Sequence, residues 1–192
     1  MTGSIEKLQK TYGIQIKWRA FPLHPETPEQ GLSLEKLFAE KGIPADVDKI
    51  MTRLKATAAK FNLPMGDRKM TFNSRLAQEL GLWAESKGKG HAFHDAAFKA
   101  YFADGLNLAR KEVLLEMVNF LGLDPVEGED VIDQRIFKAA VDEDWELSRA
   151  KGITAVPTMI MGLDRLVGAQ THEVLEKLVV KYGGKIQPLE QV

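Results

Sequence analysis

Apolar and polar residues alternate in one short stretch near the start of the chain. Ile14, Ile16 and Trp18 are separated by polar or charged residues. A period of two residues predicts a strand with one buried face. A short helix that ends at Gly13 comes before it, and a loop rich in proline and glycine follows at about residues 26–31.

From about residue 33 to residue 150 the apolar positions recur every three or four residues, which predicts amphipathic helices and no strand. There are five such stripes, near residues 47–61, 76–84, 93–101, 113–121 and 136–147. Either Asn73 or Ser74 is expected to cap the helix that carries the second stripe. The first two stripes are Val47, Ile50, Met51, Leu54, Ala58 and Phe61, and then Leu76, Ala77, Leu80, Trp83 and Ala84.

The period changes again after Gly152. Residues 153–161 and 165–168 are two β-rich runs separated by a glycine turn, which predicts a hairpin, and Thr171 then begins a last helix. A strand, a helical block and a β-β-α ending predict an α/β fold interrupted by an insertion. We therefore expect a discontinuous domain of residues 1–32 and 151–192 and a helical insertion of residues 33–150.

Composition narrows the functional classes. The chain has 26 basic and 27 acidic residues, so neither nucleic acid nor an anionic membrane is an expected partner. The start of the chain lacks a secretory pattern and no apolar run is long enough for a membrane span, so we expect a cytoplasmic location. Because there is no cysteine, disulfides and thiolate metal sites are excluded.

Several motifs together resemble the DsbA-like branch of the thioredoxin fold. They are residues 152–158 (GITAVPT) with Gly168-Ala169-Gln170, residues 18–25 (WRAFPLHP), residues 73–77 (NSRLA) and residues 93–102 (FHDAAFKAYF). The chain is most similar to cytoplasmic FrnE-type dithiol–disulfide oxidoreductases. More distant cousins are 2-hydroxychromene-2-carboxylate isomerases and kappa-class glutathione transferases. The resemblance implies a thioredoxin-like sheet with a large helical insertion.

The chain also departs from that family. In the family a first strand and a Cys-Pro-x-Cys motif precede the first helix, whose N-terminus lowers the thiol pKa. Neither is present here, so no catalytic residue is assigned, and Ser4 is expected to lie at least one turn beyond the position of the nucleophile. A start that omits upstream residues, a strand donated by a partner subunit in a homodimer, or a rearranged sheet would each account for the missing strand.

The resemblance implies that Val156 and Pro157 bind substrate, with Pro157 in the cis form. The alternative is a trans proline at the mouth of a strand, since only about 5–6% of X–Pro bonds are cis. With Pro157 in the cis form, the backbone of Val156 would be free to pair with a peptide, a protein thiol client or glutathione. Thr154 and Asn73 are further candidates, although Asn73 is equally well explained as a helix cap.

Three functions remain open at this point. The first is a protein of oxidoreductase ancestry that is inactive in thiol chemistry as given. The second is an isomerase- or transferase-like enzyme that uses glutathione as a substrate, and the third is a redox-dead binding module. No cofactor is expected, and no metal either, because the histidines (His24, His91, His94 and His172) lack a third ligand at a suitable spacing.

Overall fold

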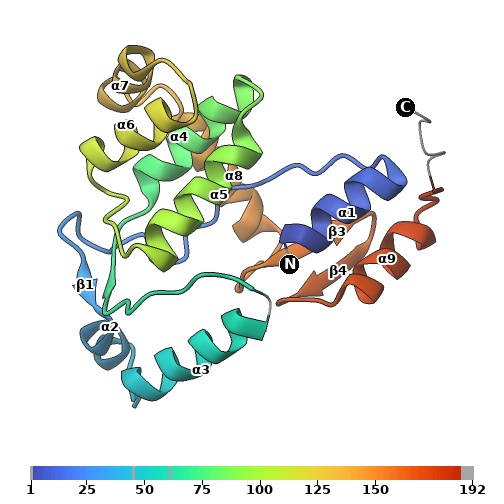
Figure 1. Cartoon of the computed structure of the whole chain (residues 1–192), viewed down its shortest axis with the longest axis horizontal. Helices are drawn as coiled ribbons and strands as arrows, with labels where there is room; N and C mark the ends of the chain where they lie inside the picture. The colour runs from blue at the N-terminus through green and yellow to red at the C-terminus, as the bar shows by residue number, and fades with distance from the viewer. Residues whose placement is uncertain (1, 45, 61, 187–192) are drawn as a thin grey trace. The chain divides into compact units, whose positions relative to one another are not determined.

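The structure is a computed structural model that describes residues 2–44, 46–60 and 62–186. It has a mixed α/β fold that divides into two compact units, Met1–Leu23 with Asp144–Val192, and His24–Glu143. Figure 1 shows the elements of both. The junctions lie earlier along the chain than residues 32/33 and 150/151, where the sequence placed them.

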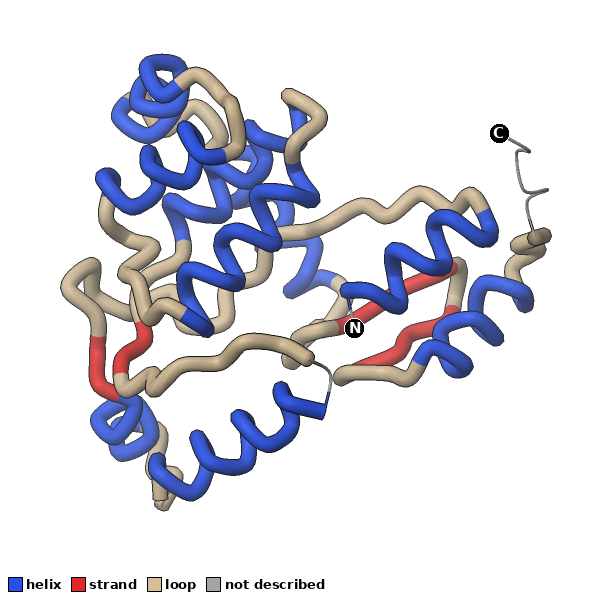
Figure 2. The backbone as a smooth tube through the Cα atoms, in the orientation of Figure 1, coloured by secondary structure: helices blue, strands red, loops and turns tan. Residues whose placement is uncertain are grey.

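The unit of Met1–Leu23 and Asp144–Val192 contains the predicted hairpin. Strands β3 (Thr158–Met161) and β4 (Asp164–Val167) pair antiparallel, with Thr158 opposite Val167 and Met161 opposite Asp164 (Figure 2). Helices α1 (Thr2–Tyr12) and α9 (His172–Lys181) pack against each other. Their buried residues Ile5, Leu8, Tyr12, Leu175 and Val179 form one apolar cluster with Met159, Met161 and Leu166 of the hairpin.

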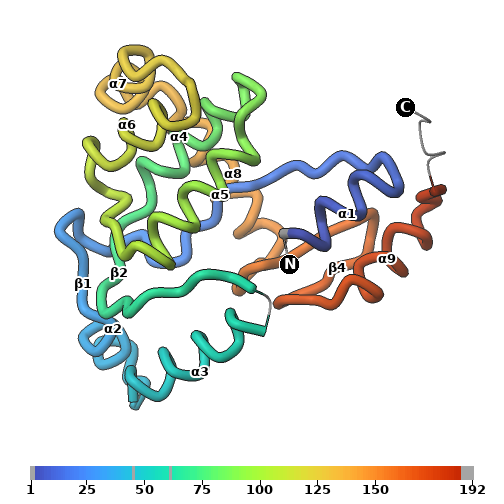
Figure 3. The backbone as a smooth tube through the Cα atoms, viewed as in Figure 1, coloured from blue at the N-terminus to red at the C-terminus, as the bar shows by residue number. Residues whose placement is uncertain are grey.

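The predicted strand over residues 14–18 is wrong, although the predicted face is right. Ile14, Ile16 and Trp18 are half-buried and pack against the apolar cluster of α1 and α9, whereas Lys17 and Arg19 are exposed. Within the described chain no strand is assigned to residues 13–22, which Figure 3 shows as an extended trace after α1. A strand requires a hydrogen-bonded neighbour, and the described residues supply none here.

The unit of His24–Glu143 is mainly helical. The first two predicted apolar stripes lie on the observed helices α3 (Val47–Lys60) and α4 (Arg75–Ser86), except for Phe61, which lies outside the described residues. The expectation of no strand in this region is wrong, because β1 and β2 pair at Leu32 with Thr71 and at Ser33 with Met70. Two-residue strands are too short to show a period in the sequence. The elements are β1 (Leu32–Ser33), α2 (Leu34–Glu40), α3 (Val47–Lys60), β2 (Met70–Thr71), α4 (Arg75–Ser86), α5 (Gly90–Phe98), the π-helix η1 (Lys99–Ala103), α6 (Lys111–Phe120) and α7 (Pro125–Asp133), with α8 (Lys138–Ala150) crossing the second junction.

The main core of this helical unit gathers around α4. Its largest fully buried side chains are Trp83, Phe93 and Leu80. Burial of such a side chain contributes about 1.5–3 kcal/mol, so helix packing here stabilises the walls of any site on this unit. Among the described helices, none is long and apolar enough to cross a membrane.

Candidate functional site

The predicted binding segment lies just before β3. The peptide bond between Val156 and Pro157 is cis. Thr154 and Val156 are exposed, with Val156 at 43%, and Pro157 is half-buried. The segment therefore presents its backbone at the surface directly before the hairpin.

The residues next to Val156 make hydrogen bonds, whereas the backbone of Val156 makes none to other described residues. The carbonyl of Pro157 accepts from the N–H of Gly168 at 2.8 Å. The hydroxyl of Thr158 donates to the carbonyl of Ala155 at 2.6 Å. In the described part of the chain, neither the N–H nor the carbonyl of Val156 has a hydrogen-bond partner. One backbone donor and one backbone acceptor of an exposed residue are thus left without partners, and an added strand pairs with groups of this kind.

Asn73 lies in the helical unit, and the fold already uses its side chain. Its Nδ2 donates to the carbonyls of Pro25 at 3.3 Å and Thr27 at 2.9 Å, and its Oδ1 accepts from the N–H of Arg75 at 2.9 Å. Ser74 occupies the N-cap position of α4 without a capping side-chain bond. Asn73 therefore caps the helix and holds the preceding loop, while Thr154, Val156 and Pro157 belong to the other unit.

A buried charge cluster in the helical unit was missed by the sequence analysis. The Glu79 carboxylate, 2% exposed, accepts from Arg75 Nε at 2.7 Å and from Arg135 Nε and Nη2 at 2.8 and 2.6 Å. Burial raises the pKa of Glu79, but the hydrogen bonds from Arg135 and Arg75 outweigh burial and lower it overall. The i,i+4 spacing of Arg75 and Glu79 on one predicted helix was the available signal; Arg135 gave none.

A cavity of about 470 Å³ adjoins this cluster, and Asn73, Arg75 and Arg135 line it. Its volume lies in the range of small-molecule sites. All the residues that line it belong to the helical unit. Of the four predicted binding residues, Asn73 lines the cavity, whereas Thr154, Val156 and Pro157 do not.

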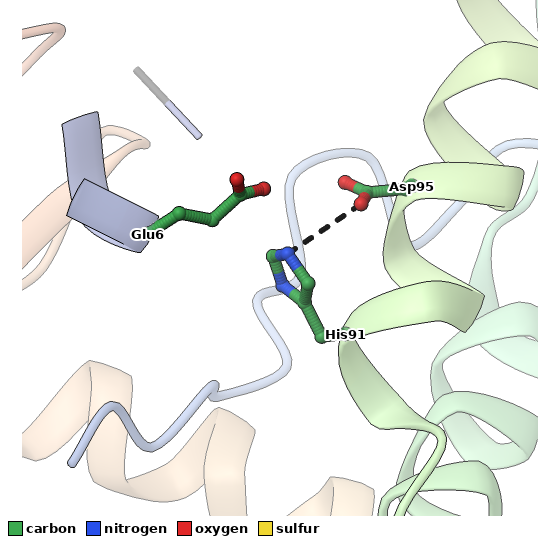
Figure 4. Close-up of side chains that lie close together, drawn as sticks. All are labelled: Glu6, His91 and Asp95. Carbon is green, nitrogen blue, oxygen red and sulfur yellow. Dashed lines mark ion pairs between the residues drawn. The ribbon is translucent and has the colours of Figure 1, made fainter. Parts of the chain in front are cut away.

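The histidines of this unit make local contacts. His91 Nε2 lies 3.5 Å from Asp95 Oδ2, one turn along α5 (Figure 4). His24 is half-buried and its Nδ1 accepts from Lys41 Nζ at 3.1 Å. Burial, followed by the charge of Lys41, lowers the pKa of His24. Burial, followed by the charge of His91, lowers the pKa of His94. We assign no metal site to these groups.

The chain is similar to one known protein in sequence and to several solved structures in fold. The Bacillus subtilis protein YwbO, which is uncharacterized, is 23% identical over 180 residues, covering 92% of this chain and 86% of YwbO. A crystal structure of a probable DsbA oxidoreductase from Streptomyces coelicolor superposes with a TM-score of 0.83 at 24% identity, covering 98% of this chain and 86% of that one. A 2-hydroxychromene-2-carboxylate isomerase superposes with a TM-score of 0.69 at 18% identity, covering 95% and 86%.

The family match spans nearly the whole chain. The model of the DSBA-like thioredoxin domain matches residues 1–180. That range includes the hairpin, the segment before it and the helical unit. The chain therefore belongs to the family of DSBA-like thioredoxin domains.

Proposed function

We propose that this chain binds extended peptides of thiol client proteins, or glutathione, through the backbone of Val156, and that these 192 residues do not catalyse thiol–disulfide exchange. The observation that supports binding is the exposed Val156, whose N–H and carbonyl lack partners in the described structure. A peptide that donates to that carbonyl and accepts from that N–H would pair antiparallel with the segment. Main-chain hydrogen bonds give affinity with little sequence preference.

The inactivity follows from the chemistry of exchange. The nucleophile that attacks a disulfide is a thiolate, and the chain has no cysteine. Thr154 and Pro157, on either side of Val156 in the chain, would support the binding segment without reacting. We place the chain in the cytoplasmic FrnE-type branch because of the motifs at residues 18–25, 73–77 and 93–102.

Two measurements test the proposal. In an insulin reduction assay with dithiothreitol, the 192-residue chain should not accelerate precipitation above the rate without protein. In an NMR titration, an extended peptide should shift the amide of Val156, and the same peptide N-methylated at the pairing residue should bind more weakly, since it has lost the donor. Turnover above background, or equal binding of both peptides, would contradict the proposal.

Val156→Ala serves as the matched control for the peptide titration. It removes most of an exposed side chain and leaves the backbone donor and acceptor in place. If backbone pairing supplies the affinity, V156A should bind the unmethylated peptide nearly as well as the unmodified chain. A loss of binding in V156A would assign the affinity to the side chain instead.

A glutathione-dependent isomerase or transferase is the second candidate. The structural similarity to a 2-hydroxychromene-2-carboxylate isomerase favours it. Saturable glutathione binding at millimolar concentration, together with turnover of a chromene carboxylate, would support this candidate over the first. Under either proposal, a homodimer in which a partner subunit donates a strand is one of the three explanations for the missing strand. A strict monomer by light scattering would argue against strand donation.

A further inference from the structure

The cavity in the helical unit has an apolar part and a charged part. Leu76 from α4, Ala109 from the segment before α6, and Ile132 from α7 supply apolar surface. Glu29 and Arg135 supply charge. With a volume of about 470 Å³, the cavity could enclose a small molecule that carries one apolar group and a charged end.

Hydrogen bonds hold the walls of this cavity in place. Asn73 fixes the loop before Glu29 by its bonds to two carbonyls of that loop. The carbonyl of Glu29 itself accepts from Asn107 Nδ2 at 2.9 Å, and Asn107 Oδ1 accepts from the N–H of Ala109 at 2.8 Å. Three of the lining residues are thus tied together through two asparagines. A binding site with fixed walls loses less entropy when it is filled.

Arg135 is held in an unusual conformation beside the cavity. Its φ is 53°, in the left-handed region that residues other than glycine rarely adopt. Its Nε and one Nη2 proton bond to the buried carboxylate of Glu79. A guanidinium has five N–H donors, so three remain, and the side chain is 41% exposed with no further partner among the described residues.

Of the other three charged residues that line the cavity, Arg75 and Asp133 already form ion pairs, whereas Glu29 does not. Arg75 bonds to Glu79 and to Asp142 Oδ1 at 2.8 Å, and Asp133 pairs with Lys111 at 2.7 Å. The Glu29 carboxylate has no ion pair or hydrogen bond in the described structure. Among the described residues, the cavity therefore offers the three unused N–H donors of Arg135 and one unpaired carboxylate, that of Glu29.

Glu29 and Arg135 line the same cavity. The hydrogen bonds that Arg135 donates to Glu79 are the main cause that raises the pKa of Arg135, and the charges of Glu79, Asp142 and Glu29 add to it. A ligand with only a positive charge would leave the remaining donors of Arg135 unused, and a ligand with only a negative charge would leave Glu29 unpaired in the filled cavity. A ligand that carries both charges would pair with both.

We propose that this cavity binds a small zwitterion with an apolar side chain, of the chemical class of a free α-amino acid. Its carboxylate would accept hydrogen bonds from the free edge of Arg135, and its ammonium would pair with Glu29. Its side chain would pack against Leu76 and Ile132. This site uses none of the residues around Val156, so it stands or falls independently of the proposed function.

The first test compares three probes on the full chain by NMR. L-leucine carries both charges, N-acetyl-L-leucine only the anion, and L-leucine methyl ester only the cation. With L-leucine up to about 20 mM, a range that detects millimolar dissociation constants, we expect saturable methyl shifts at Leu76 and Ile132. Each derivative should bind roughly fivefold more weakly than L-leucine, because it loses one partly exposed ion pair. Absence of saturation, or equal affinity for all three, would overturn the proposal.

The second test uses variants that should fold normally. Glu29→Gln removes an exposed, unpaired charge, and Glu116→Gln is the matched control because Glu116 is an exposed residue of α6 outside the cavity lining. E29Q should weaken L-leucine binding roughly fivefold and leave N-acetyl-L-leucine binding unchanged. E116Q should change neither. Equal L-leucine affinity of E29Q and the unmodified chain would remove Glu29 from the site and refute the zwitterion.

Discussion

Replacing Glu79 by glutamine tests how much the buried charge cluster stabilises the helical unit. The substitution keeps the shape of the side chain and removes the charge that Arg75 and Arg135 share. Removing one partner of a buried ion pair costs about 3–5 kcal/mol, because the remaining charge stays buried. Here Arg75 retains Asp142 and the Arg135 side chain is 41% exposed. We therefore expect the lower end of that range, about 3 kcal/mol.

Thermal and chemical unfolding measure this loss. In a chain of 192 residues, 1 kcal/mol lowers the melting temperature by about 2–4 °C, so E79Q should melt roughly 6–12 °C lower. Amide exchange of α4 should quicken by the same free energy, which assigns the loss to the helical unit. Glu85→Gln, an exposed position on the same helix, is the control and should stay within about 0.5 kcal/mol of the unmodified chain.

The pH dependence gives a second readout. The folded-state pKa of Glu79 lies below its ordinary value of 4.5, since the arginine hydrogen bonds outweigh the opposing effect of burial. A carboxyl group with a lowered folded pKa contributes stability that is complete above its unfolded pKa and is lost as pH falls through the folded pKa. The difference between the unmodified chain and E79Q should thus be constant near neutral pH and shrink below about pH 4.5. A loss under 1 kcal/mol at pH 7, or a difference that does not change down to pH 3, would refute this reasoning.

Two further substitutions probe the walls around the cluster and the π-helix. Asn73→Ala removes both bonds to the loop carbonyls and the cap of α4, so we expect a loss of about 2 kcal/mol and faster amide exchange over residues 24–31; unchanged exchange there would contradict it. In Gly66→Ala the new Cβ would lie 2.2 Å from the carbonyl oxygen of Ala103, so urea unfolding should show a loss of about 1–3 kcal/mol. The control is Gly3→Ala on α1, where the new Cβ meets no atom within 4 Å, and it should show no loss because alanine favours a helix over glycine.

Local patterns in the sequence anticipated much of the fold. The apolar spacing over α3 and α4 follows from the period of a helix. The β-rich runs and the glycine turn predicted the hairpin of β3 and β4, and both signals depend on neighbouring residues only. The same reasoning predicted the half-buried face of Ile14, Ile16 and Trp18 correctly. The absence of cysteine likewise settled, without any structure, that this chain supplies no thiolate.

Long-range pairing decided the rest. The alternation at residues 14–18 could not reveal whether a neighbouring strand exists, because a ladder depends on a segment elsewhere in the chain or outside it. The pairing of Leu32 with Thr71 was equally invisible, since two-residue strands carry no period.

For the charge cluster around Glu79, too, one part was predictable from the sequence and another depended on the tertiary structure. The sequence by itself determined that Arg75 and Glu79 share a face of one helix. Only the tertiary structure brought Arg135 to the same carboxylate, 56 positions away along the chain, and made it line the same cavity as Glu29. Periodicity reports which side of an element is buried, whereas the partner of a buried charge is chosen by how the elements pack.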